Sequence, residues 1–263
     1  VLVGFGGGIT CDIAGFAAAT YQRGVNFILF PSTLLSQVDA SVGGKTAINH
    51  PQGKNMIGAF HQPIKVFADV DLLSSLPKVE ISNGLSEVIK HALISDKKYF
   101  DWLEKNMESI ISLKPEALSY AITRSVEIKA EIVSKDEKEK GIRKFLNFGH
   151  TFGHAIELYG EFKKFSHGQS VAIGMLMAME LSKINEGFSE EDLNRSRKLI
   201  NKANPDINLK HGFDERRLIE NMSVDKKRSG NKLIFIVLEK IGQAKIKTDI
   251  DESKIAKAIH SLV

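Results

Sequence analysis

The spacing of apolar residues divides the chain into two parts. Short apolar runs at residues 1–5, 26–30 and 65–69 predict buried strands. Between the first two runs, the segment TCDIAGFAAATYQRG has the spacing of a helix. Strands that alternate with a helix are typical of an α/β unit with a parallel sheet. The sequence therefore predicts an α/β domain over residues 1–76.

The pattern of apolar and polar residues changes near Pro77, where long amphipathic stretches replace the short apolar runs. Apolar residues three and four apart predict helices, at about 83–95, 97–111, 115–134, 150–160, 168–186 and 189–203. Near the end, KLIFIVLEKIGQAKIK has two β-rich runs around a glycine-containing turn, which predicts a hairpin. Residues 77–263 are therefore expected to form a mostly α-helical domain.

Composition and charge exclude several classes of protein. The 263 residues are 43% hydrophobic, which is enough to bury the core of one large domain or two modest ones. The 36 Lys and Arg residues are interspersed with 32 Asp and Glu residues, so no nucleic-acid partner is expected. The longest apolar stretch in the interior, VAIGMLMAM, is too short to span a membrane. Because Cys11 is the single cysteine, no intrachain disulfide can form, and we expect a soluble protein of the reducing cytoplasm.

Three glycines, Gly6, Gly7 and Gly8, lie between the first predicted strand and the first predicted helix. Without Cβ atoms the backbone can approach a phosphate closely, and the N–H groups of a helix N-terminus point toward it. A tight turn between strand and helix explains the same residues equally well. Since the spacing is not G-x-G-x-x-G, the run alone does not identify a Rossmann fingerprint.

The stretch VDASVGGKTAINHPQGKN combines glycines with Asp39, Lys45, Lys54 and Asn55. Lysines beside glycines suit an anionic substrate or a dinucleotide, because the charges then lie on backbone that can approach closely. A loop that solvates its own lysines is the alternative.

The segment NGLSEVIKHALI places Glu87, Lys90 and His91 on a predicted helix whose opposite face is largely apolar. Glu87 and Lys90 are three residues apart and could form a simple surface ion pair. A functional site is the other explanation, and the local pattern leaves both open.

Two histidines, His150 and His154, lie one helical turn apart in LNFGHTFGHAIE, and His167 begins a later helix. Three histidines could converge with a carboxylate on one zinc ion. The pair resembles H-E-x-x-H, but residue 151 is threonine, so a metalloprotease is disfavoured. Satisfied core or surface histidines remain the alternative.

Taken together, several blocks resemble the 3-dehydroquinate synthase family of NAD- and metal-dependent cyclases. They are GGGITCDIAGFAAATYQRG, PSTLLSQVDASVGGKTAINHPQGKNMIGAFHQP, LPKVEISNGLSEVIKH and LNFGHTFGHAIE followed by HGQSVAIGM, and the match continues to DKKRSGNKLIFIVL. Ser32 and Gln169 depart from the family pattern, which has threonine and glutamate there. The resemblance implies an α/β N-terminal part that is the remnant of a Rossmann-like NAD-binding domain, followed by a mostly α-helical domain for metal and substrate.

The resemblance also implies the site residues. Zinc or cobalt would be held by Glu87, His150 and His167, with His154 outside the ligand set. The implied catalytic residues are Glu139, His154, Lys45, Lys90, Arg143 and Asn147. The implied substrate-binding residues are Arg23, Asp39, Lys45, Asn55, Lys129, Arg143, Asn147, His154 and Lys226.

For NAD, the resemblance implies Gly7, Gly8 and Ile9 at the pyrophosphate and Asp12 near the nicotinamide. The remaining implied NAD-binding residues are Ser32, Thr33, Lys54, Leu72, Leu73, Ser74, Ser75 and Asn83.

The resemblance implies one reaction of the shikimate pathway, which supplies chorismate and the aromatic amino acids. A phosphorylated seven-carbon keto acid, 3-deoxy-D-arabino-heptulosonate 7-phosphate, would be converted to 3-dehydroquinate and phosphate. The implied steps are transient oxidation by NAD, phosphate elimination, re-reduction and intramolecular aldol closure, in a homodimer where Arg23 reaches the partner's site. Family members carry a further half-domain before the glycine-rich strand, so we also expect weak NAD binding and turnover.

Three alternatives remain. A related sugar-phosphate cyclase such as 2-deoxy-scyllo-inosose synthase acts on a substrate without a carboxylate, against which Lys129, Arg143 and Asn147 argue. A polyol dehydrogenase with a similar fold is the second alternative. An inactive fragment that only binds metal is the third.

Overall fold

The computed structural model describes residues 1–51, 53–207, 212–228 and 233–262, without the side chains of residues 53 and 223–228. The chain divides into two compact units. The first contains Val1–Val88 and Glu108–Lys140, and the second contains Ile89–Met107 and Gly141–Val263. Because the chain passes between the units more than once, the predicted single boundary near Pro77 is not confirmed.

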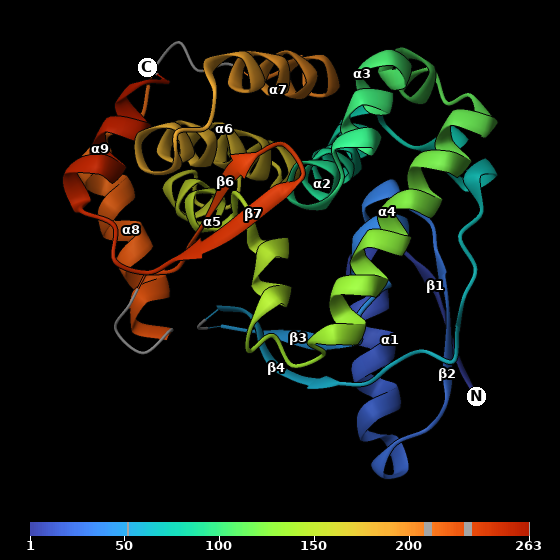
Figure 1. The fold of residues 1–263 in the computed structure, drawn as a ribbon. Coiled ribbons are helices and arrows are strands. Elements are labelled where there is room, and N and C mark those ends of the chain that lie inside the picture. Colours follow the sequence, from blue (N-terminus) through green and yellow to red (C-terminus); the bar gives the residue numbers. More distant parts are fainter. Residues whose placement is uncertain (52, 208–211, 229–232, 263) are drawn as a thin grey trace. The chain divides into compact units, whose positions relative to one another are not determined.

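The first unit is built on a parallel sheet with the strand order β1-β2-β5. These strands are β1 (Leu2–Gly6), β2 (Phe27–Pro31) and β5 (Lys65–Val66), at the three predicted positions. The helix α1 (Gly8–Thr20) connects β1 to β2 and packs on both (Figure 1). Its buried side chains, Cys11, Ala14 and Ala18, form a small core with Phe27 and Leu29 of β2. The predicted α/β character of this part is therefore confirmed. The predicted burial of its first and third strands is wrong, because Val3 and Phe5 of β1 and both residues of β5 are exposed in the described structure.

An antiparallel hairpin lies between β2 and β5 along the chain in the first unit. Its strands are β3 (Lys45–His50) and β4 (Gly53–Phe60), with Lys45 opposite Phe60. Thr46 is buried, and its hydroxyl donates to the backbone oxygen of Ala59 at 2.9 Å. Part of this glycine- and lysine-rich stretch is therefore a hairpin, in which Lys45 and Lys54 are exposed. The first unit also contains η1 (Tyr21–Arg23), η2 (Ser36–Ala40), η3 (Val70–Ser75), α4 (Pro115–Lys135) and the N-terminal part of α2 (Lys78–Ser95).

The second unit is mostly helical and is centred on α6 (His167–Glu186). Every residue of α6 from Ser170 to Ser182 is buried, and the helix contacts α5, α7, α9 and the strand β6 (Figure 1). The elements of this unit, besides the end of α2, most of α3 (Lys97–Ile111) and α6, are η4 (Ile142–Asn147), α5 (His150–Tyr159), α7 (Glu190–Ala203), α8 (Glu215–Arg228), β6 (Phe235–Lys240), β7 (Gln243–Lys247) and α9 (Glu252–His260). The predicted helices and the predicted hairpin are confirmed within a few residues, whereas α8 and α9 were not predicted.

Among the described residues, no helix combines the length and the apolar character needed to cross a bilayer.

Candidate metal centre and anion-binding residues

Backbone contact between α5 and α6 is the feature that positions the central histidines. A Cβ atom on Gly174 of α6 would lie 2.7 Å from the backbone nitrogen of Gly153 on α5. A Cβ atom on Gly149 would lie 2.8 Å from the backbone nitrogen of Met175. Real Cβ atoms essentially never approach other atoms so closely, so the two helices can pack at this distance only through glycines. Gly149 also has a φ of +79°, which glycine adopts without steric cost.

His150 and His167 are the first residues of these two helices. His150 follows the left-handed Gly149, which is the N-cap of α5. His167 follows Ser166, which forms a capping box with Gln169 at the start of α6. Gln169 supplies its side-chain oxygen to the Ser166 N–H at 3.0 Å, so the departure from glutamate preserves the cap.

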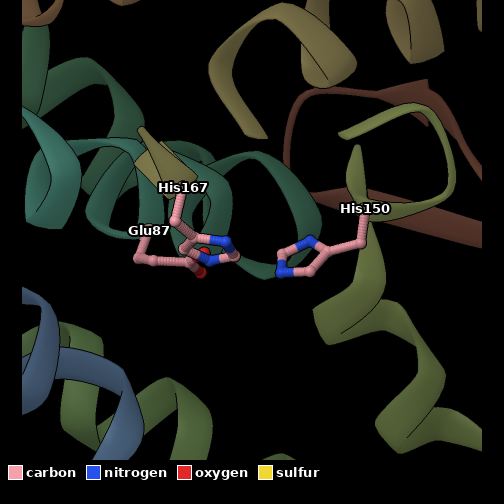
Figure 2. Close-up of side chains that lie close together, drawn as sticks. All are labelled: Glu87, His150 and His167. Carbon is pink, nitrogen blue, oxygen red and sulfur yellow. The ribbon is translucent and has the colours of Figure 1, made fainter. Parts of the chain in front are cut away.

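Glu87 completes a group with the two histidines. One potential ligand atom from each of Glu87, His150 and His167 lies within 4.8 Å of the other two. Figure 2 shows the two imidazole rings turned toward one another, with the Glu87 side chain beside His167. Glu87 is fully buried on α2, and that unbroken helix continues directly into the Ile89–Ser95 segment of the unit that contains both histidines.

This group fits a catalytic zinc or cobalt ion. Donors about 2.0–2.2 Å from a tetrahedral zinc are roughly 3.3 Å apart, so shifts of about 1 Å would bring these three onto one ion. Two imidazoles and one carboxylate leave a fourth position for a substrate oxygen. His154, whose ring centroid lies 5.6 Å from that of His150, does not belong to the group. The side chain of His154 is exposed.

The Nδ1 atoms of both histidines face oxygen atoms. Nδ1 of His150 lies 3.2 Å from the backbone oxygen of Phe148, and Nδ1 of His167 lies 3.3 Å from Oε1 of Glu157. A carbonyl oxygen can only accept a hydrogen bond, and so can an ionised carboxylate. Nδ1 is therefore the donor in each case, which leaves Nε2 as the nitrogen that can bind a metal.

A second group of potential ligands consists of Asp39, Glu87 and His91, again within 4.8 Å of one another. The ammonium of Lys129 lies 2.6 Å from Oδ1 of Asp39 and 2.6 Å from its backbone oxygen. A positive charge already bound to Asp39 would repel a divalent cation at this place. We therefore assign no metal to this group.

Asp12 of α1 lies in the electrostatic field of the same Asp39–Lys129 pair. Burial, followed by repulsion from Asp39, raises the pKa of Asp12 from its ordinary 3.8 to about 6. Lys129 lowers this pKa by a smaller amount. The N-terminal half of α1 therefore carries a carboxyl group that can gain or lose a proton near neutral pH.

Three of the predicted cationic residues are buried. Lys90, Lys129 and Arg143 have relative exposures of 1%, 6% and 2%. Buried cations are costly unless anionic or polar groups surround them. Each of the three has further polar or electrostatic contacts. Because they are buried, these side chains contribute little charge to the protein surface. They are better suited to binding a small anion.

Lys45 and Glu139 form an ion pair within the first unit. Lys45 begins β3, and Glu139 lies in the turn after α4 with a φ of +56°. The Glu139 side chain retains 19% exposure and the Lys45 side chain 50%. The pair is therefore accessible to a ligand. Asn147 lies at the end of η4 and is partly buried.

The predicted NAD-binding residues gather in part at the carboxyl ends of β1 and β2. Gly7 is the N-cap of α1, and the N–H of Ser32 donates to the oxygen of Gly6 at 2.8 Å. Thr33 lies next to Gly7, because a Cβ atom there would be 3.2 Å from the Thr33 methyl group. Ligands of open α/β sheets bind at this edge.

The other predicted NAD-binding residues are spread over several elements. Ile9 is 73% exposed on α1, whereas Leu73 of η3 is fully buried. Leu72, Ser74 and Ser75 also belong to η3, Asn83 lies buried on α2, and Lys54 is exposed on β4.

Two predicted substrate-binding residues with described side chains, Arg23 and Asn55, are not joined to these clusters. Arg23 is exposed in η1, which follows the C-terminal end of α1, and the 13 residues of α1 span about 20 Å from Gly8. Asn55 is exposed on β4, where its N–H donates to the Asn49 side chain at 3.1 Å. Lys226 lies on the last turns of α8, and its side chain is outside the part of the chain that the structure describes.

Comparison with known protein families identifies the family to which the chain belongs. The model for 3-dehydroquinate synthase N-terminal domains matches residues 1–83, and the model for the C-terminal domains matches residues 84–228. The chain belongs to the 3-dehydroquinate synthase family. The resemblance of the sequence blocks is thereby confirmed. A 3-dehydroquinate synthase of Bordetella pertussis is 49% identical over 245 residues, which are 93% of this chain and 68% of that protein.

Solved structures of related cyclases resemble the whole chain. A 2-epi-5-epi-valiolone synthase from Streptomyces hygroscopicus with NAD⁺ and Zn²⁺ bound has a TM-score of 0.91 and 26% identity, over 99% of this chain and 72% of that one. A 2-deoxy-scyllo-inosose synthase complexed with carbaglucose-6-phosphate, NAD⁺ and Co²⁺ has a TM-score of 0.88 and 30% identity, over 98% and 73% of the two chains. Sequence identity is thus higher to the 3-dehydroquinate synthase than to either of these cyclases.

Proposed function

We propose that the protein is an NAD- and metal-dependent lyase that converts 3-deoxy-D-arabino-heptulosonate 7-phosphate to 3-dehydroquinate and phosphate. The observation that carries this proposal is the group of Glu87, His150 and His167 in a chain of the 3-dehydroquinate synthase family. Bound NAD⁺ and Zn²⁺ or Co²⁺ in the related cyclases support the choice of cofactors.

Glu87, His150 and His167 would hold the divalent metal. Their donor types and spacing support this role, as does the orientation of each Nδ1 toward an oxygen acceptor. The glycine run before α1, with Ser32 and Thr33 at the end of β2, would hold the pyrophosphate and adjacent parts of NAD. When bound, the metal would supply a Lewis acid for a substrate hydroxyl, and NAD⁺ a reversible hydride acceptor.

The buried cations would bind the two anionic ends of the substrate. Lys90, Lys129 and Arg143 offer charge-assisted hydrogen bonds to carboxylate or phosphate oxygens. Lys129 also holds the Asp39 carboxylate, which can accept a hydrogen bond from a substrate hydroxyl. Asn147 would add an amide contact. With one substrate held at several points, the protein would contribute mainly orientation and charge stabilisation.

Proton transfer would fall to two accessible groups. The ion pair with Lys45 orients the Glu139 carboxylate, which would act as a proton acceptor. His154 lies beside His150 on the same face of α5 and is exposed, so it can exchange protons with substrate or water. Arg23, Asn55 and Lys226 complete the proposed substrate contacts. The proposal includes a homodimer in the cytoplasm, in which Arg23 would reach the partner's site.

Phosphate release tests this function directly. The protein would be incubated with NAD⁺, Zn²⁺ and either the heptulosonate 7-phosphate or a hexose 6-phosphate without a carboxylate. We expect phosphate only from the first substrate, and we expect Glu87→Ala to abolish both zinc binding and phosphate release.

Three outcomes would favour the alternatives. Faster release from the hexose phosphate would indicate a different cyclase. Hydride exchange with glycerol and no phosphate release would indicate a polyol dehydrogenase. Zinc binding without either reaction would indicate a chain that only binds metal.

A further inference from the structure

One buried glutamate of α5 is not among the predicted site residues. Glu157 is 7% exposed and lies seven residues after His150, which puts both residues on the same face of the helix. Carboxylates are rarely buried to this extent unless a partner stabilises them. The nature of its partner therefore indicates what Glu157 does.

One partner of Glu157 is a residue of the candidate metal centre. Oε1 of Glu157 lies 3.3 Å from Nδ1 of His167. The Glu157 side chain is 9% exposed, whereas the His167 side chain is 35% exposed. The imidazole of His167 is therefore partly exposed, whereas the carboxylate that it contacts is buried.

This contact selects one orientation of the His167 ring. Because the carboxylate accepts, the proton of the neutral imidazole is placed on Nδ1 and the lone pair on Nε2. Histidine ligands of metal ions commonly donate their other N–H to a carboxylate or a backbone oxygen in this way. His150 has the second kind of acceptor, the backbone oxygen of Phe148 at 3.2 Å.

We propose that Glu157 is a positioning residue that holds His167 in the ring orientation and tautomer needed to bind the metal. The inference rests on the proposed metal site of Glu87, His150 and His167. It assigns a role to a fourth residue that would not touch the ion. Substitution of Glu157 should weaken metal binding without removing a ligand, by about 10- to 100-fold.

The test compares metal dissociation constants in competition with a chelator, using Co²⁺ as the probe. Glu157→Ala removes the acceptor, and Glu157→Gln keeps the shape and one acceptor oxygen. The matched control is Glu180→Ala, because Glu180 is also 7% exposed in the same unit but pairs with Arg197 at 2.6 Å. We expect about 10- to 100-fold weaker Co²⁺ binding for Glu157→Ala, a smaller loss for Glu157→Gln, and no change for Glu180→Ala.

Two further measurements separate positioning from folding. The visible absorption of bound Co²⁺ should change in Glu157→Gln, because the ligand geometry changes, while the melting temperature of its metal-free form stays near that of the parent. A Glu157→Ala protein that binds Co²⁺ within twofold of the parent, while His150→Ala loses binding, would overturn the proposal. If His150→Ala also kept full affinity, the metal site itself would be refuted.

Discussion

Gly174→Ala tests whether the metal centre depends on backbone contact between α5 and α6. The new methyl group would lie 2.7 Å from the backbone nitrogen of Gly153 and close to the backbone oxygen of Gly149. These are main-chain atoms, so no change of side-chain rotamer can relieve the contact. The helices must separate, and α5 carries His150 with it.

Two opposing effects determine the size of the destabilisation. Alanine is favoured over glycine inside a helix by about 1 kcal/mol. Overpacking of a well-packed interior costs about 1–3 kcal/mol, and a contact with rigid backbone belongs at the upper end. The net loss should be about 1–2 kcal/mol, which lowers the melting temperature by roughly 2–8 °C for a protein of this size.

The assay combines thermal unfolding of the metal-free protein with a chelator-competition measurement of zinc affinity. Gly174→Ala should lower the melting temperature because the helices are forced apart. It should also lower the zinc affinity, because His150 moves away from His167. The control is Gly187→Ala, where φ is +74° and no atom lies within 4 Å of the added Cβ. This substitution should lower the free energy of unfolding by about 1–2 kcal/mol through backbone strain alone, and it should leave the zinc affinity unchanged. A Gly174→Ala protein as stable as the parent, or more stable, would refute the reasoning.

Further predictions concern charged side chains. The raised pKa of Asp12, about 6 against 3.8, means that the folded state retains a proton that the unfolded state has released. Stability should therefore fall as the pH rises from about 4 to 6. Asp12→Asn should remove this slope and, allowing for partial exposure, stabilise the protein by about 1–2 kcal/mol at pH 7 in urea titrations. Lys129→Met leaves Asp39 without its ammonium partner and should cost about 1–3 kcal/mol in the same titrations. Arg195→Met removes contacts of 2.7 Å to Asp101 and 2.5 Å to Glu104, and its cost of about 1 kcal/mol should shrink in 1 M salt.

Each of these predictions has a contradicting result. An unchanged pH slope in Asp12→Asn would mean that another group titrates between pH 4 and 6. If Lys129→Met were as stable as the parent, the bond to Asp39 would contribute nothing to folding. A salt-independent loss in Arg195→Met would indicate packing, for instance of the guanidinium 5.3 Å from the Phe100 ring centroid, as the dominant interaction.

Hydrophobic periodicity predicted most of the helices because their buried faces are strongly apolar. In α3, for example, Phe100, Leu103, Met107 and Ile110 are fully buried at helical spacing. The same reasoning missed α8, in which few described residues are buried, notably Leu218 and Met222. A weakly apolar helix is stabilised by its neighbours, and a pattern within its own sequence does not reveal those neighbours.

The β3–β4 hairpin was missed for a different reason. Its strands contain Gly58 and several polar residues, and much of β4 is exposed, so alternation of apolar and polar positions is weak. A close approach of the strands explains the glycine, because a Cβ atom on Gly58 would lie 3.0 Å from the Cβ atom of Ala47. The Pro51 turn between two short β-capable runs was the available signal.

For the candidate site, local sequence identified the donor types but not their partners. The spacing of His150, His154 and His167 was compatible with all three histidines binding one ion. It was equally compatible with none of them binding a metal. The resemblance to a family selected Glu87 as the third donor. The Glu157–His167 contact depends on how α5 ends and α6 begins after the intervening turn, which no helical periodicity specifies.

The two histidines lie at helix starts, and this placement explains how distant residues can be held so closely. The first residue of a helix is defined by its cap, which is local, and by the packing of the helix, which is not. Gly149 and Ser166 determine where α5 and α6 begin, and Gly153 and Gly174 determine how closely the helices approach. The placement of the two histidines is therefore set by main-chain contacts between α5 and α6. The remaining freedom is rotation of each imidazole, which is where the Phe148 oxygen and the Glu157 carboxylate act.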